Sequence, residues 1–130
     1  MKELDALPGL ISVTPVGSRV TCNPPPADTD LNLLVLVRHA KWDAVLHMLS
    51  LLGFDHDGSD ISDKLDFDFD SSFRSYSRVE VNVIVTEDEE FHSRFLAATS
   101  VAKRLNLMQK EDRVALFQAV LYGNACVDFS

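Results

Sequence analysis

Residues 17–37, GSRVTCNPPPADTDLNLLVLV, contain the strand that decides the fold and the polar residues that lead into it. The part from Leu31 to Val37 is apolar on both faces and rich in branched side chains, which is typical of a strand covered on both sides. The three prolines at positions 24–26 fix φ and remove amide donors, so they predict an extended spacer. Upstream, residues 10–16 alternate well enough for a short strand, with Pro15 at its end or at an edge. We therefore expect a first strand, a Gly-Ser turn, a spacer and then a central strand.

The remaining chain shows further helix and strand patterns. Apolar residues recur at spacings of three and four from Lys41 onward, which predicts an amphipathic helix that ends at Gly53. Strict alternation predicts two adjacent strands, LDFDF at 65–69 and RVEVNVIV at 78–85, arranged as a hairpin. Two helices follow, from Thr86 to about Leu105 and from about Lys110 to Tyr122. The predicted fold class is α/β (α+β): a small mixed sheet of about four to five strands with helices packed on it, in a single domain over residues 1–130.

The start and the buried side of the first of these two C-terminal helices can also be predicted. Thr86 and Glu89 have the spacing of a capping box, in which each side chain satisfies an amide at the other end of the first turn. A buried stripe is expected at Phe91, Phe95, Ala98 and Val101. In the last helix the expected buried residues are Val114, Phe117, Val120 and Leu121.

Composition and charge limit the classes of function. The chain has 130 residues and a net charge of -8, with 46% hydrophobic residues. No apolar run approaches the length of a membrane span, so we expect a soluble protein with no membrane partner. The acidic N-terminal residues lack the long apolar stretch of a secretory signal, which makes the cytoplasm the expected location. The negative charge argues against strong non-specific nucleic-acid binding, but a small anion bridged by metal ions remains compatible with it.

Two other kinds of site are disfavoured by spacing. Cys22 and Cys126 are too few for a disulfide framework, and we expect both to be free thiols. The acidic loop at 54–63, FDHDGSDISD, has Gly58 at position four of a calcium loop that starts at Asp55, where an EF-hand needs glycine at position six. A solvated loop is the better interpretation of that segment.

The order of elements and one short motif resemble the nucleotidyltransferase superfamily of the DNA polymerase β type. The motif is Gly17-Ser18 after a strand, followed within the family's spacing by Asp28-Thr29-Asp30-Leu31-Asn32. The segment VNVIVTEDEEFHSRFLAATSVAKRLNLMQKEDRVALFQAVLYG, residues 81–123, further resembles small phage-encoded proteins of this superfamily. If that origin holds, the cytoplasm in question is that of the host.

The resemblance implies roles for the motif residues. Gly17 would allow close approach of a triphosphate, and Ser18 with Arg19 would hold its phosphates. Carboxylates two apart on a strand share one face, so they can share the Mg²⁺ or Mn²⁺ ions that stabilise nucleotidyl transfer. Two registers are open: Asp30 with Asn32 in the place of the second aspartate, or Asp28 with Asp30.

The third carboxylate of the family has several candidates here. Glu80, expected within the strand at 78–85, is favoured as a catalytic residue and metal ligand. Asp66 and Asp68 on the preceding predicted strand are the alternatives, although the solvent face of an edge strand explains them well. Asn82 lies two residues after Glu80 and is expected to contact a base, a ribose or a metal-bound water.

Four other polar residues could in principle reach a ligand: His39, Lys41, His92 and Arg94. Surface roles are the better interpretation of these side chains, because they stand at a helix start or on the polar side of a helix. The chain has no Walker loop, no Gly-x-Gly-x-x-Gly and no Ser/His/Asp order, which removes the P-loop, dinucleotide and common hydrolase interpretations.

Two hypotheses follow for the function. In the first, a metal-dependent nucleotidyltransferase binds an NTP and transfers a nucleoside monophosphate to a hydroxyl of an unidentified acceptor, either protein or RNA. In the second, the chain is a non-catalytic nucleotide- or protein-binding relative, such as a phage factor that interferes with a host pathway. Asn32 separates the two, since a neutral amide is a weaker ligand than a carboxylate for a hard cation.

Overall fold

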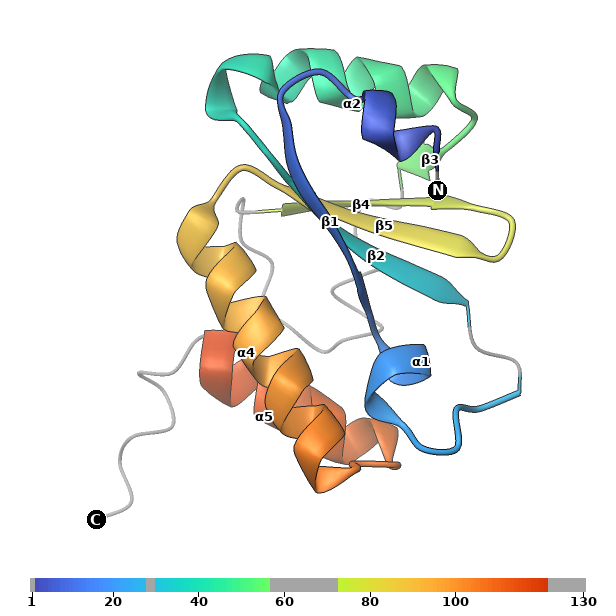
Figure 1. Ribbon diagram of the computed structural model, residues 1–130, viewed down its shortest axis with the longest axis vertical. Helices are drawn as coiled ribbons and strands as arrows, with labels where there is room; N and C mark the ends of the chain where they lie inside the picture. The colour runs from blue at the N-terminus through green and yellow to red at the C-terminus, as the bar shows by residue number, and fades with distance from the viewer. Residues whose placement is uncertain (1, 28–29, 57–72, 122–130) are drawn as a thin grey trace.

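The computed structural model describes residues 2–27, 30–56 and 73–121, which form a five-stranded sheet flanked by helices (Figure 1). The strands are β1 (Leu10–Val16), β2 (Leu31–Val37), β3 (Asp55–His56), β4 (Phe73–Arg78) and β5 (Val81–Thr86). The α-helices are α1 (Ser18–Thr21), α2 (Trp42–Leu51), α4 (Glu89–Leu105) and α5 (Lys110–Leu121), with 3-10 turns η1 (Leu4–Ala6) and η2 (His39–Lys41). Among the described helices, none combines the length and the apolar character that a membrane crossing requires.

The sheet is mixed, as predicted from the sequence. Its strand order is β1-β2-β5-β4-β3, in which β2 and β5 are parallel and the other neighbours are antiparallel. The predicted central strand is confirmed: β2 has a neighbour on each side, and Leu33 to Val37 are all buried. The connection from β2 to β5 is long because parallel neighbours need a crossover, whereas β4 and β5 form a tight hairpin.

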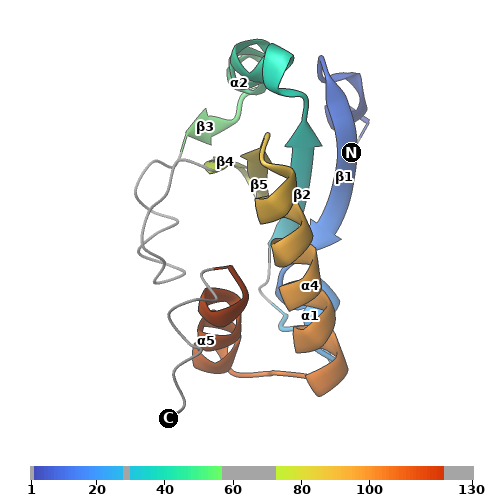
Figure 2. The ribbon, with the colours of Figure 1, turned by 90° about the vertical axis from the view of Figure 1, so that its left-hand side faces the viewer.

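Helices cover both faces of the sheet. Side chains alternate along each strand, so Leu33, Val35 and Val37 of β2 face one way and pack with Val45 and Leu49 of α2. The intervening residue Leu34 faces the other way and belongs to a cluster with residues of α4 and α5, namely Phe91, Phe95 and Leu121. Figure 2 shows α4 and α5 together, away from α2, with α1 beside the lower part of α4.

The hairpin lies further along the chain than the alternation predicts. The strand expected at 78–85 is interrupted, since β4 ends at Arg78 and β5 begins at Val81. Val79 and Glu80 form the turn, and Glu80 has a positive φ of 62°. The placement of Glu80 within a strand is therefore wrong. The expected partner strand at 65–69 lies outside the described residues.

The helix α4 begins at Glu89, and its cap differs from the prediction. Asp88 is the N-cap, and its Oδ1 accepts from the backbone amides of Glu90 at 2.9 Å and Phe91 at 3.2 Å. Thr86 is the last residue of β5 and is fully buried, so it cannot start the helix. The predicted capping box is wrong because its first residue, Thr86, belongs to strand β5.

The predicted buried stripes are confirmed only in part. Phe91, Phe95 and Ala98 are buried, but Val101 is 38% exposed. In α5, Leu121 is buried and Phe117 packs partly buried against the same cluster. Val114, Phe117 and Val120 are all only half-buried, so the expected full burial is confirmed for Leu121 alone. The helix α5 thus covers the sheet less completely than α4 does.

Candidate functional site

The Gly-Ser turn joins β1 to the short helix α1. Gly17 has φ 79° and ψ -170°, a conformation that only glycine adopts readily. Its carbonyl oxygen accepts from the amides of Val20 at 2.9 Å and Thr21 at 3.0 Å. A Cβ at this position would lie 3.0 Å from both Cβ and Cγ of Asn32 and would collide with Asn32 Nδ2. The group that approaches Gly17 closely in this structure is therefore the Asn32 side chain.

The turn is held in place through α1 and the segment after it. The backbone amide of Asn23 donates to Asn106 Oδ1 at 2.9 Å, and Asn106 Nδ2 donates back to the Asn23 carbonyl at 3.2 Å. Cys22, a buried free thiol as predicted, accepts from Arg113 Nη1 at 3.3 Å. The same guanidinium nitrogen donates to the Leu107 carbonyl at 2.9 Å. These contacts tie the turn to the connection between α4 and α5.

Three polar side chains meet beside the turn, at the start of β2 and β5. Asn32 and Asn82 are paired in register on these parallel strands. Asn82 Nδ2 donates to Asn32 Oδ1 at 3.0 Å and to Asp30 Oδ2 at 3.2 Å. Asp30 is exposed, whereas the two asparagines are half-buried. The cluster formed by Asp30, Asn32 and Asn82, hereafter the amide cluster, contains one carboxylate and two neutral amides.

The amide cluster belongs to a polar row that extends from β2 to β3, whereas Val16, the residue of β1 paired with Asn32, is apolar and buried. Asn82 is paired with Ser77 of β4, and Ser77 is paired with Asp55 of β3. Directly paired residues place their side chains on the same face. This is the face that α4 and α5 cover further along the strands, where Leu34 and Ile84 are buried. The sequence patterns missed Ser77 and Asp55, because only the strand register brings them into line with Asn82.

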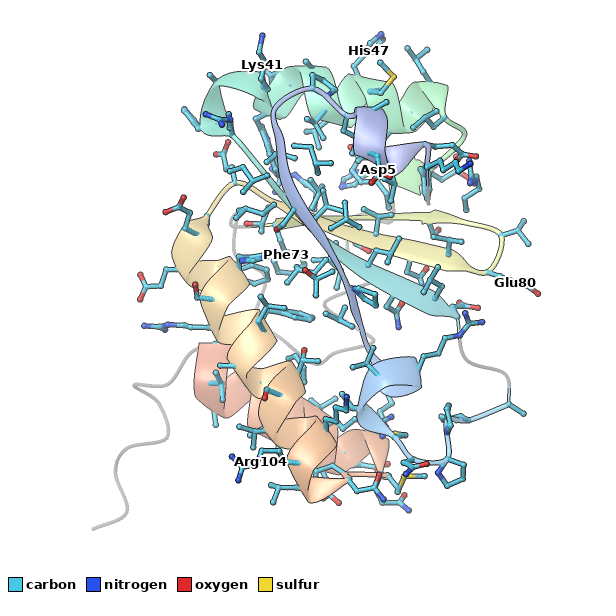
Figure 3. All side chains as sticks on the ribbon, viewed as in Figure 1. Asp5, Lys41, His47, Phe73, Glu80 and Arg104 are labelled. Carbon is cyan, nitrogen blue, oxygen red and sulfur yellow. The ribbon has the colours of Figure 1, made fainter. Side chains whose placement is uncertain are left out.

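The structure brings together some of the predicted site residues and leaves others apart. Gly17, Asp30, Asn32 and Asn82 meet, and Ser18 follows Gly17 at the first position of α1. Arg19 is exposed on the same short helix. Glu80 does not join them: it is exposed in the hairpin turn, and its side chain is directed outward in Figure 3. Glu80 does not share a strand face with Asn82, because β5 begins only at Val81.

Three predicted acidic residues cannot be compared with this arrangement. Asp28, the first residue of the second register, lies outside the described residues, as do Asp66 and Asp68. Within the described part of the chain, no group of three or more His, Cys, Asp or Glu side chains is placed to hold a metal ion.

The described donors supply only part of the metal centre that the resemblance implies. Mg²⁺ in such sites is usually bound by one or two carboxylates together with phosphates and waters, in octahedral geometry. The amide cluster offers one carboxylate, and the oxygens of Asp30 and Asn32 that face Asn82 already accept hydrogen bonds. The position on β5 that pairs with Asn32 is occupied by the neutral amide of Asn82, which adds no further carboxylate.

The other polar residues considered from sequence lie away from the amide cluster. His39 Nδ1 is 2.8 Å from Glu87 Oε2 and the His39 side chain is 88% exposed. Arg94 contacts Glu90 at 2.6 Å and donates to the Leu121 carbonyl at 3.0 Å, which links α4 to α5. Lys41 is exposed near α2. These contacts are compatible with surface roles.

His92 has a different environment. Its Nε2 is 3.4 Å from Ser12 Oγ, so it connects α4 with the edge strand β1. Burial lowers the pKa of His92 below its ordinary value, and the nearby Glu89 carboxylate partly opposes that shift.

Comparison with known proteins supports the fold. No family model matches the sequence, and no curated protein sequence matches it. The structure is similar to a solved structure described as conserved protein GrpB from Enterococcus faecalis, with a TM-score of 0.61 and 15% sequence identity. The alignment covers 95% of this chain and 89% of that chain. This likeness confirms the predicted fold class, a small mixed sheet with helices packed on it, and at this identity it concerns the fold alone.

Proposed function

We propose that this domain binds a nucleotide beside the Gly17–Ser18 turn and is a non-catalytic relative of the nucleotidyltransferases. The amide cluster is the observation that carries the proposal. Its side chains lie beside a turn whose backbone conformation suits glycine, and its two asparagines are half-buried at the start of β2 and β5. Asn82 donates to both Asn32 and Asp30, and the Asn32 amide nitrogen beside Gly17 is a donor that a ligand oxygen would satisfy.

The composition of the cluster argues against efficient transfer. Nucleotidyl transfer uses two divalent ions that stabilise the attacking and leaving oxygens. Those ions need several anionic oxygen ligands, and the described site supplies one carboxylate, Asp30. Asn32 and Asn82 keep the shape of a carboxylate but carry no charge. Binding without chemistry is thus the function that these residues support best.

The surroundings of the turn suit the phosphate end of a nucleotide. Gly17 presents no side chain, Ser18 supplies a hydroxyl and Arg19 supplies a cation on an exposed surface. A guanidinium binds phosphate oxygens in a planar, bidentate manner. In a protein with a net charge of -8, Arg19 supplies a local positive charge beside the turn.

The test is calorimetric titration of the full chain with each of the four common NTPs, once with MgCl₂ and once with EDTA. We expect binding of at least one NTP, and about tenfold weaker binding for Ser18→Ala and for Arg19→Ala. Ser50→Ala on the exposed side of α2 is the matched control and is expected to bind like the parent chain. Absence of binding under both conditions, or equal affinity of all variants, would contradict the proposal.

Metal-dependent transfer is the second candidate, because Asp30 is exposed beside the turn and Asp28 precedes it by two residues in the sequence. In this form of the proposal, Mg²⁺ or Mn²⁺ is the cofactor and an acceptor hydroxyl on protein or RNA is the partner. Labelled NTP incorporation distinguishes the candidates: transfer by the parent chain that is lost in Asp28→Asn supports an enzyme. Transfer that appears only in the double variant Asn32→Asp/Asn82→Asp supports a non-catalytic relative.

The place of action follows from the ligand. We propose that the protein acts in the cytoplasm, where nucleoside triphosphates are available, and that a phage-encoded factor would act there on a host pathway. Fractionation of cells that produce the tagged chain from its own start codon tests the location.

A further inference from the structure

We propose that Asn32 binds a phosphate group through its amide nitrogen without a metal ion, and that Asp30 positions this donor through Asn82. The inference rests on the proposed nucleotide binding and specifies how the ligand is held. It assigns to Asn32 the opposite task from a metal-binding aspartate at the same position, because a donor attracts anions and a carboxylate attracts cations.

The first step of the argument is the orientation of Asn82. An ionised carboxylate accepts hydrogen bonds and donates none. Asp30 Oδ2 lies 3.2 Å from the Asn82 side-chain nitrogen, so that contact requires the NH₂ end of Asn82 to face Asp30. The same nitrogen also lies 3.0 Å from Asn32 Oδ1. Asp30 therefore fixes which end of the Asn82 amide faces both neighbours.

The second step is the orientation of Asn32. Because Asn82 presents its NH₂ group, Asn32 must present its oxygen, and its own Nδ2 is turned away from Asn82. That nitrogen faces Gly17, where an added Cβ would collide with it. The absence of a side chain at Gly17 is thus what leaves room for the Asn32 nitrogen beside the Gly17–Ser18 turn.

The third step concerns the donors that remain. Among the described residues, no hydrogen-bond acceptor contacts Asn32 Nδ2, and the side chain is half-buried. A donor that is partly withdrawn from water gains from pairing with an anionic oxygen, since such charge-assisted hydrogen bonds are stronger than neutral ones. A phosphate beside the turn would supply that oxygen.

Metal binding by Asn32 would disrupt this arrangement. To point its oxygen at a cation beside Gly17, Asn32 would have to turn its amide over, and its NH₂ group would then face the NH₂ group of Asn82. One hydrogen bond would be lost and two donors would oppose each other. The hydrogen bond that Asn82 donates to Asp30 prevents Asn82 from turning in compensation.

The experiment measures binding of inorganic triphosphate and of ATP to the full chain, in EDTA and then in MgCl₂, by calorimetry. Side-chain amide signals of the ¹⁵N-labelled protein provide a second measurement. We expect the parent chain to bind both ligands in EDTA, with the Asn32 NH₂ signal shifting on addition of triphosphate. Asn32→Asp should bind at least tenfold more weakly in EDTA and recover in MgCl₂, because it exchanges a donor for a metal ligand.

A second variant tests the positioning role. Asn82→Asp leaves Asn32 intact but presents only acceptors, so Asn32 should turn its NH₂ group toward residue 82 and away from the turn. We expect at least tenfold weaker triphosphate binding in EDTA. Ser77→Asp adds the same charge in the same row, one strand further away, and should weaken binding less than threefold.

The outcomes separate this inference from the proposed function. If the parent chain binds ATP only in MgCl₂, the metal-free role of Asn32 is wrong while nucleotide binding stands. If neither ligand binds in either buffer, both proposals fail. Equal weakening by Asn82→Asp and Ser77→Asp would show that added charge is sufficient and would overturn the positioning role of Asp30 and Asn82.

Discussion

The two faces of the sheet are built differently, although the same strands supply both. The face toward α2 is continuous: Leu33, Val35 and Val37 of β2 lie beside Val83 and Val85 of β5, and all five are buried. The face toward α4 and α5 mixes apolar and polar side chains: Val16, Leu34, Phe73 and Ile84 are buried in its apolar cluster, and Ser75 and Thr86 are buried polar residues of the same face. At the start of β2 and β5 this face carries Asn32 and Asn82.

This difference indicates that the α2 face of the sheet supplies stability and that the opposite face carries the candidate binding site. A row of valines and leucines is what a buried parallel pair requires, and β2 with β5 meets that requirement on the α2 side. On the other side, two amides and one carboxylate interrupt the core beside the Gly17–Ser18 turn. Substitutions on the α2 face should therefore affect folding, whereas those in the amide cluster should affect ligand binding more than folding.

The largest effect is expected from truncation on the α2 face. Leu49 is fully buried against the sheet, so Leu49→Ala should lower the free energy of unfolding by about 3–5 kcal/mol through lost burial and a residual cavity. Leu51 lies on the same helix but is 67% exposed, and Leu51→Ala should change the value by less than about 0.5 kcal/mol. Urea denaturation followed by circular dichroism measures both, and similar losses in the two variants would contradict the assignment of the α2 face as the main core.

The next effect concerns the turn at the polar side. Gly17→Ala combines a backbone conformation that suits only glycine with a collision against Asn32, and should lower the free energy of unfolding by about 2–4 kcal/mol. Gly53→Ala is the matched control: φ is also positive there, but the nearest atom, Arg78 Cδ, is 3.7 Å from the added Cβ. We expect about 1–2 kcal/mol for that change. Equal losses would mean that Asn32 does not pack tightly on Gly17.

Much of the fold could be predicted because local periodicity reflects burial directly. The run from Leu31 to Val37 predicts a strand buried on both faces, and the three-and-four spacing after Lys41 predicts α2. The hairpin was misplaced because Val79 continues the alternation although it is 87% exposed in the turn. Neither Val79 nor Glu80 is a turn-forming residue type, so no local signal marks the break.

The candidate site could be predicted only as a set of residue types. Gly17, Asp30, Asn32 and Asn82 were expected to contribute, and the structure places them together. The pairing of Asn32 with Asn82 depends on the register between β2 and β5, which are far apart in sequence. Register is decided by the packing of the whole sheet, so the contact between Asn32 and Asn82 could not be predicted from local patterns.

A smaller effect is expected at the start of α4, the helix that closes the polar side. Asp88→Ala removes the acceptor for the amides of Glu90 and Phe91 and should lower the free energy of unfolding by about 1 kcal/mol. Asp88→Asn retains a capping oxygen and should stay close to the parent chain. Thr86→Ser, which keeps the hydroxyl that accepts from the Asp88 amide at 3.0 Å, tests whether Thr86 contributes through its methyl group in the sheet. Equal stability of Asp88→Ala and Asp88→Asn would assign the helix start elsewhere.

The smallest effect is a pH dependence on the same side of the sheet. Burial lowers the pKa of His92, so the folded protein binds this proton less tightly than the unfolded chain does. Protonation then favours unfolding: stability is complete above the unfolded value of about 6.5 and decreases as the pH falls through 6.5 toward the lower folded pKa. We expect the urea midpoint of the parent chain to fall between pH 7.5 and pH 5.5 more than that of His92→Gln, which keeps a polar group near Ser12 but does not titrate. The described core residues on the α2 face include no histidine. A fall of the urea midpoint that is present in the parent chain and absent in His92→Gln would therefore locate this pH response on the α4 side. Parallel curves for the two proteins would instead show that His92 titrates alike in the folded and unfolded chains.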